Sequence, residues 1–227
     1  MAKDNAVYRC MRNGRTQIML CGDLENIEAR DRLISYLPDN VGMVYSDPPW
    51  NPGNATYWRT HAKKDPCLSY NAFLDAWCSV VSECISRSAN HIFTEQSANE
   101  KHCQMLLDAV ARNDKWNLPL LEKWTVFYGS PGSISVKRPN ILLHFGNEKI
   151  TTNPEGMAGE PMTTRTCAGV GLKTGSWIVD PCVGKGMTSR QAHYFDWNCV
   201  GNELNPDRLE KTLQWLRSQG YEIKELS

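Results

Sequence analysis

Four consecutive residues, Asp47, Pro48, Pro49 and Trp50, combine the groups needed to hold an amino group on an aromatic ring. They follow an apolar run at 41–45 that predicts a strand. Because prolines lack an N–H and fix φ, the chain leaves this strand as a rigid, extended turn. The Asp47 carboxylate and the Pro48 carbonyl can both accept from one exocyclic NH₂, and Trp50 offers a plane for a flipped base. The alternative is a turn that ends a strand beside a core tryptophan.

A second motif lies near the end of the chain. A short apolar strand at 176–179 is followed by a loop that contains Gly184 and Gly186, and then by a helical stretch through Phe195. A Gly-x-Gly loop between a strand and a helix lets the backbone approach a ligand closely, near a helix N-terminus. On its own this pattern is a weak signal.

The residues that follow strengthen it. Another predicted strand at 197–201 ends in Asn202, Glu203 and Leu204. An acidic residue at the end of the second strand binds ribose hydroxyls in nucleotide-type sites. The sequence therefore predicts a nucleoside-bearing cofactor, against the alternative of structural glycines and a surface glutamate.

With these motifs in this order, the chain resembles the S-adenosylmethionine-dependent amino-methyltransferases of the permuted, "beta" order. In that family the DPPW motif, here 47–50, precedes the cofactor loop. The similarity begins at 17–23, a predicted strand that ends in Gly22 and Asp23, and runs to about residue 217. Family members methylate N6 of adenine, or less often N4 of cytosine, in DNA. The resemblance implies a DNA adenine-N6 methyltransferase with S-adenosylmethionine as its cofactor.

The resemblance also assigns roles to individual positions. Asp23 and Leu24 match residues that flank the cofactor adenine, the loop after Asp180 surrounds its methionine part, and Glu203 contacts its ribose. The implied catalytic residues are Asp47, Pro48, Pro49 and Trp50. The implied cofactor-binding residues are Asp23, Leu24, Asp47, Asp180, Cys182, Gly184, Gly186, Met187, Thr188, Asn202, Glu203 and Leu204.

The chain departs from the family at three places. Cys182 stands where a phenylalanine is usual, and Lys185 replaces a small residue between the glycines. Glu160 and Pro161 stand where members often have Lys-Pro at the start of a helix. A cofactor pocket of altered shape is therefore expected, with one contact usually made by lysine in question.

Strand and helix patterns alternate along the chain. Seven runs are predicted as strands: 17–21, 41–45, 91–94, 123–128, 141–145, 176–179 and 198–200. Helical patterns are predicted at 24–37, 70–88, 98–113, 162–172, 188–194 and 206–219. The alternation predicts an α/β fold with a doubly wound, mostly parallel sheet. The runs at 123–128 and 141–145 have no helix between them, so an antiparallel hairpin is expected at one edge. The resemblance makes this the Rossmann-like, seven-stranded methyltransferase fold with one antiparallel edge strand, in circularly permuted order.

Length and composition fit a single methyltransferase domain over 1–227. The nine cysteines include no Cys-x-x-Cys pair, so reduced, buried thiols are expected and no metal site is predicted. No signal peptide or long apolar stretch is evident, which predicts a cytoplasmic protein without a membrane partner.

The formal net charge is zero, which is unusual for a protein that must hold a polyanion. Two segments, 51–69 and 129–161, are predicted to be small recognition loops. Basic and aromatic side chains in them are candidates for binding DNA, with a solvated loop as the alternative. These candidates are Tyr57, Trp58, Arg59, His61, Lys63, Lys64, Lys137 and Arg138. Such small loops imply very short or relaxed specificity, a homodimer that shares its loops, or a partner subunit.

Three other functions remain open at this point. The mRNA adenosine methyltransferases also resemble the DPPW arrangement, although their glycine loop is usually degenerate, whereas Gly184 and Gly186 stand here. Cytosine-N4 methylation of DNA is a second alternative. The third is an inactive, nucleic-acid-binding partner subunit, which would have no need to keep both motifs intact. Methyl transfer to an amine requires no catalytic histidine or cysteine, so all five histidines are interpreted as surface or structural residues.

Overall fold

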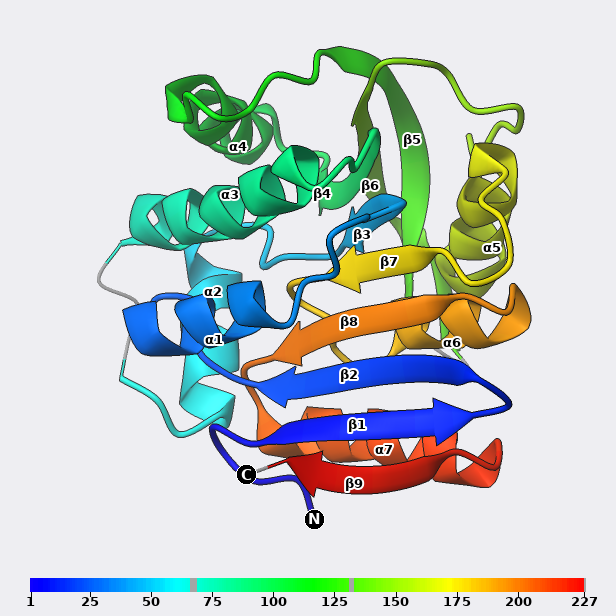
Figure 1. The fold of residues 1–227 in the computed structure, drawn as a ribbon. Helices are drawn as coiled ribbons and strands as arrows, with labels where there is room; N and C mark the ends of the chain where they lie inside the picture. The colour runs from blue at the N-terminus through cyan, green and yellow to red at the C-terminus, as the bar shows by residue number, and fades with distance from the viewer. Residues whose placement is uncertain (66–68, 131–132, 227) are drawn as a thin grey trace.

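The computed structural model describes residues 1–65, 69–130 and 133–226, with the side chains of 130 and 133–138 outside that description. In this part of the chain nine strands form one sheet, flanked by seven helices (Figure 1). The strands are β1 Val7–Arg12, β2 Arg15–Cys21, β3 Met43–Ser46, β4 His91–Ser97, β5 Leu120–Ser130, β6 Ser133–Gly146, β7 Trp177–Asp180, β8 Asn198–Glu203 and β9 Glu222–Leu226. The helices are α1 Ile27–Ser35, α2 Pro52–His61, α3 Tyr70–Ser86, α4 Glu100–Arg112, α5 Gly159–Val170, α6 Met187–Tyr194 and α7 Pro206–Ser218.

The strand order is β5-β6-β4-β3-β7-β8-β2-β1-β9. The five central strands, from β4 to β2, are mutually parallel. Their carboxyl ends therefore meet at one edge of the sheet, and Figure 1 shows the arrowheads of β7, β8 and β2 on the side where α1 and α2 lie. The doubly wound, mostly parallel sheet predicted from the sequence is confirmed.

Both faces of the sheet are covered. Along β2, Ile18 and Leu20 pack into a core with α1 to α4, whereas Met19 and Cys21 pack into a second core with α5 to α7. This follows from the alternation of side chains along a strand. Two apolar layers of this kind explain why the central strands are apolar throughout their length.

The connections change direction between β3 and β7. From β3 the chain crosses through α3 to β4 on one side, and from β7 it crosses through α6 to β8 on the other. In open α/β sheets, ligands bind outside the carboxyl ends of the strands at such a switch point. The topology therefore directs attention to the residues that follow β3 and β7.

The prediction of seven strands with one antiparallel edge strand was wrong in two respects. The hairpin β5–β6 lies at one edge as expected, but its antiparallel strand is β6, one place inside β5. At the other edge the antiparallel strand β1 and then β9 extend the sheet. Arg9 and Arg12 interrupt the apolar residues of β1, and β9 carries charged residues at three of its five positions, so a search for apolar runs passes over both strands.

The predicted loop at 51–69 contains a helix instead. Asn51 caps α2 by accepting from the Asn54 N–H, and Pro52 occupies the first turn, where its missing N–H is harmless. Ala55 is the one buried residue of α2, so the helix carries almost no apolar pattern. Of the second predicted loop, residues 133–146 form β6 and residues 159–161 begin α5. The backbone of Lys137 and Arg138 thus lies in a strand, while their side chains fall outside the described part.

Among the described residues, no helix has the length and apolar character needed to cross a bilayer. The eight cysteines that the structure describes are free thiols, and all but Cys182 are buried. Cys67 lies outside the described residues.

Candidate active site

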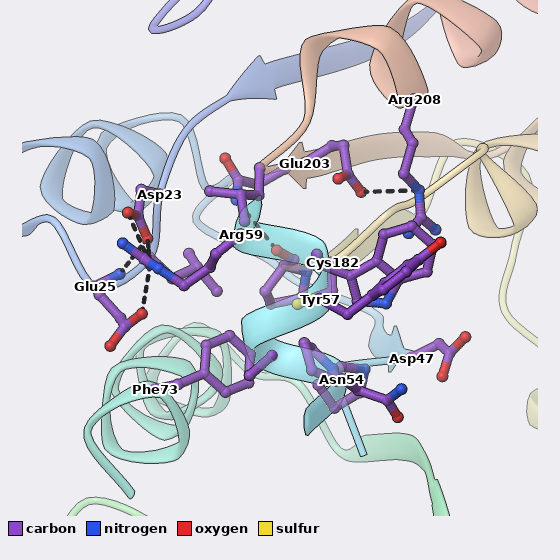
Figure 2. Close-up of a pocket in the computed structure, with 18 of the residues that line it drawn as sticks. Asp23, Glu25, Asp47, Asn54, Tyr57, Arg59, Phe73, Cys182, Glu203 and Arg208 are labelled. Atoms are coloured by element: carbon purple, nitrogen blue, oxygen red, sulfur yellow. Dashed lines mark hydrogen bonds and ion pairs between the residues drawn. The ribbon is translucent and has the colours of Figure 1, made fainter. Parts of the chain in front are cut away.

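A cavity of about 380 Å³ opens at the switch point between β3 and β7. Its lining combines the ends of β2, β3 and β8 with one side of α2 (Figure 2). The predicted site residues in the lining are Asp23, Leu24, Asp47, Pro48, Pro49, Trp50, Tyr57, Trp58, Arg59, Cys182, Asn202, Glu203 and Leu204. Residues from the two motifs, more than 130 positions apart in the chain, therefore share one cavity.

The segment 47–50 forms a braced turn directly after β3. The Trp50 indole N–H donates to Asp47 Oδ1 at 2.7 Å, and the Tyr70 hydroxyl of α3 donates to the Pro49 carbonyl at 2.6 Å. The Trp50 ring meets Tyr128 of β5 edge to face, with the ring centroids 5.1 Å apart. The turn is therefore fixed from α3 and β5 as well as by its own prolines.

The Asp47 carboxylate is exposed to the cavity. Although the Asp47 side chain is accessible in the cavity, the protein packed around it desolvates the carboxylate and raises the pKa of Asp47 to about 6, against the lowering effects of the Trp50 hydrogen bond and the Arg208 charge. A carboxylate with this pKa is mostly ionised at neutral pH and can still accept a proton.

Asp180 supports the loop that contains Gly184 and Gly186 through hydrogen bonds, and it is not among the residues that line the cavity. It is almost fully buried and accepts from the Cys182 N–H at 2.9 Å and from the Thr188 hydroxyl at 2.5 Å. Burial raises the pKa of Asp180 to about 7. Its role in the structure is to hold both ends of the loop that connects β7 to α6.

Gly184 and Gly186 both need a left-handed backbone, with φ of 59° and 86°. A Cβ on Gly184 would lie 2.6 Å from Arg208 Nη2, and one on Gly186 would lie 2.8 Å from the Thr212 side chain. Met187 begins α6 immediately after the second glycine. Glycine is therefore required here both for the backbone conformation and for the closeness of α7.

Glu203 ends β8 next to the cavity. Its Oε1 accepts from the Asn205 N–H at 2.9 Å, and its Oε2 lies 3.9 Å from Arg208 Nε. The Arg208 guanidinium in turn lies 4.0 Å above the Trp58 ring of α2. Arg208 thus lies between the Trp58 ring and Glu203, the acidic residue that the sequence assigned to a ribose. Figure 2 shows the Arg208 side chain directed at Glu203.

Arg59 makes a second link, between α2 and the residues that follow β2. Its guanidinium lies 2.9 Å from Asp23 and 2.5 Å from Glu25, and the Arg59 side chain is only 13% exposed. It faces the cavity wall rather than an open surface, which does not suit the phosphate contact predicted for it. Trp58 is likewise half-buried in the lining.

The remaining predicted nucleic-acid residues are more exposed. Tyr57 lines the cavity but is 50% exposed, and it packs against His61 with ring centroids 3.9 Å apart. Lys63 is exposed just after α2, and Lys64 is paired with Asp4. Contact of these residues with nucleic acid stays a prediction.

Several residues of the site were missed in the sequence. Tyr70 and Tyr128 fix the turn, and Arg208, Glu25 and Asn54 line the cavity. The sequence could have indicated Arg208, because it lies in the first turn of the helix that follows Glu203. No sequence pattern indicates Tyr128, since only the pairing of β5 at the far edge of the sheet brings it to Trp50.

Metal ligation has no structural support in the described part of the chain, where no group of three His, Cys, Asp or Glu side chains could hold an ion. Burial and the neighbouring carboxylates raise the pKa of the Cys182 thiol well above its usual range. Cys182 is therefore a neutral thiol at physiological pH and a poor nucleophile.

No protein-family model matches the sequence, and no curated protein matches it either. Solved structures share its fold. One is TTHA0409 of Thermus thermophilus, a candidate DNA modification methylase solved with S-adenosylmethionine, with a TM-score of 0.57 and 15% identity over 88% of this chain and 93% of that one.

Two further structures are similar. M1.HpyAVI gives a TM-score of 0.56 at 10% identity, over 87% of this chain and 97% of that one. The cytosine-N4-specific PvuII DNA methyltransferase gives 0.55 at 13% identity, over 86% and 84%. At these identities the similarity establishes the fold, which is the fold of the methyltransferase structures, and function must be argued from the site.

The buried Asp180 generates a prediction about stability and pH. In the folded protein Asp180 keeps its proton up to about pH 7, whereas an unfolded chain loses it near the ordinary value of 3.8. The stability that this group contributes is full below about pH 4 and is lost as the pH rises to 7. Asp180→Asn should therefore gain stability relative to the wild type between pH 4.5 and pH 8, by about 3 kcal/mol.

Urea unfolding at both pH values measures this difference. Asp75→Asn, at a carboxylate that is 53% exposed, is the matched control and should show little change with pH. Parallel stability curves for Asp180→Asn and the wild type would contradict the assignment of a raised pKa.

Proposed function

We propose that this protein is an S-adenosylmethionine-dependent DNA methyltransferase that acts on N6 of an adenine flipped out of the helix. The observation that carries the proposal is the meeting of two acceptor groups, the Asp47 carboxylate and the Pro48 carbonyl, with Glu203 in one cavity. The fold shared with TTHA0409, which was solved with S-adenosylmethionine, supports it.

The cavity residues fit the cofactor. The cavity volume of about 380 Å³ lies within the range of small-molecule sites. Glu203, in the lining, suits the ribose hydroxyls, whereas Gly184 and Gly186 lie outside the lining and pack against Arg208 and Thr212 of α7. Asp23 and Leu24, just after β2, line the same cavity and would flank the adenine ring. When bound, S-adenosylmethionine supplies an electrophilic methyl group.

The contribution of the chain itself is position and electrostatics. An exocyclic amine is a poor nucleophile because its lone pair is delocalised into the ring. Hydrogen bonds from its two N–H groups to Asp47 and the Pro48 carbonyl favour a more pyramidal nitrogen and stabilise the positive charge that develops on it. Asp47, ionised near neutral pH, is then placed to take the proton that the nitrogen loses.

Adenine is favoured over cytosine by the Asp-Pro-Pro-Trp sequence, on the family resemblance. The fold does not separate the two bases, because a cytosine-N4-specific enzyme is among the structures that share it. Cytosine N4 is therefore the second candidate substrate. DNA would approach over α2, where Tyr57 and Lys63 are exposed, with a homodimer or partner subunit adding the charge that this neutral chain lacks.

The direct test is transfer of labelled methyl groups from S-adenosylmethionine to duplex DNA, single-stranded DNA and RNA, followed by nucleoside mass spectrometry. N6-methyladenine in DNA supports the proposal, and N4-methylcytosine moves it to the second candidate. Methylated adenosine in RNA alone would replace DNA as the substrate. No product on any substrate, despite cofactor binding, would refute autonomous methyl transfer.

Asp47→Ala should reduce methyl transfer by at least about 100-fold, because it removes a group that stabilises charge in the transition state. The cofactor dissociation constant should change little, as calorimetry can measure. Asp75→Ala, at an exposed aspartate on α3, is the control and should retain activity. Loss of cofactor binding together with activity would show that Asp47 serves mainly the cofactor.

Glu203→Gln should weaken cofactor binding by about tenfold or more, because a charge-assisted hydrogen bond to a ribose hydroxyl contributes about 1.5–3 kcal/mol. Trp58→Ala should also weaken it, since Trp58 covers Glu203 through Arg208. Calorimetry with S-adenosylmethionine measures both, with Glu222→Gln on the exposed β9 as the control. If Trp58→Ala changes only DNA affinity, Trp58 belongs to the DNA surface as the sequence suggested.

A further inference from the structure

Trp50 uses its one polar atom within its own turn. Its indole N–H donates to Asp47 Oδ1 at 2.7 Å, three residues earlier in the chain. Indole has a single donor and no acceptor, so this bond satisfies its whole hydrogen-bonding capacity. A phenylalanine in its place would keep a flat ring but would have no donor to offer.

The bond is held in place by neighbouring elements. The edge-to-face contact with Tyr128 is made at an interplanar angle of 82° and fixes the plane of the Trp50 ring. The Tyr70 hydroxyl fixes the intervening peptide through the Pro49 carbonyl. With the ring and the peptide both fixed, the N–H points at Asp47 without losing further rotamer freedom on binding.

The hydrogen bond also acts on the charge of Asp47. A donor to a carboxylate favours its ionised form, because only that form accepts fully at both oxygens. Among the groups that offset the desolvation of Asp47, the Trp50 hydrogen bond is the largest and the Arg208 charge is second. The other titratable groups that interact with the Asp47 charge are Glu95 of β4, Asp180 at the end of β7, and the Cys182 thiol. The donor and the carboxylate belong to the same rigid turn, so this effect is present before any ligand binds.

We propose that Trp50 is a positioning residue for methyl transfer: its N–H holds Asp47 Oδ1, keeps the carboxylate charged, and leaves Oδ2 to receive the substrate amine. This inference rests on the proposed function and differs from a role in stacking on the flipped base. Stacking needs only the ring, whereas this role needs the indole N–H. The two roles can therefore be separated by a variant that keeps a ring and removes the donor.

Trp50→Phe is that variant. The pKa of Asp47 should rise by about one unit, because the carboxylate loses its closest donor. Two measurements report it: a ¹³C NMR titration of the Asp47 carboxyl in the ligand-free protein, and the midpoint of the acid limb in the pH profile of kcat. Both should shift upward together, and the loss of kcat should be larger at pH 6 than at pH 8.

Trp116→Phe is the matched control. It removes an indole N–H that donates to the Leu118 carbonyl at 3.1 Å, outside the cavity lining. The Asp47 titration should be unchanged in this variant. Tyr128→Leu provides a second test if Trp50→Phe does not fold, because it frees the Trp50 ring without removing the donor. It should shift the Asp47 titration in the same direction by less.

An Asp47 titration that is identical in the wild type and in Trp50→Phe would overturn the inference. A loss of kcat that is equal at every pH would also overturn it, and would leave Trp50 as a stacking platform. The NMR titration needs neither cofactor nor DNA. If the wild type transferred no methyl group, the proposed function would fail while the effect of Trp50 on Asp47 could still be measured.

Discussion

The parallel direction of β2, β3, β7 and β8 is the constraint on which the site depends. Parallel strands end at the same edge, so Asp23, Asp47, Asp180 and Glu203, which follow or end these strands, gather at one place. Four carboxylates in a small volume repel one another and lose hydration. The structure offsets this with Arg59, Arg208, the Thr188 hydroxyl and the Trp50 indole, each bonded to or beside one of them.

The folded structure gives the acidic residues different surroundings. Asp180 is buried below the glycine loop and is held neutral until about pH 7, which suits a structural group. Asp47 faces the cavity with a pKa of about 6 and a donor on one oxygen, which suits a group that must accept hydrogen bonds and a proton. The different surroundings of Asp47 and Asp180 thus give different protonation properties to two aspartates that each precede a proline in the sequence.

Helix α2 links the two halves of the cavity. It starts at the end of the 47–50 turn, and its other end carries Trp58 and Arg59 to Glu203, Asp23 and Glu25 through stacking and ion pairs. Asp23 and Glu203 are therefore linked through these contacts to the helix that follows the 47–50 turn.

The sequence alone determined the seven principal strands, the two motifs and their order, because apolar runs, prolines and glycines act locally on the backbone. It did not determine β1, where arginines interrupt the apolar residues, β9, which is mostly charged, or α2, which has one buried residue. The tertiary structure alone decided that Tyr128 and Tyr70 hold the 47–50 turn and that Arg59 faces Asp23 and not the surface. Those contacts join residues 21 to 78 positions apart, and no local pattern encodes which side chains a folded sheet brings together.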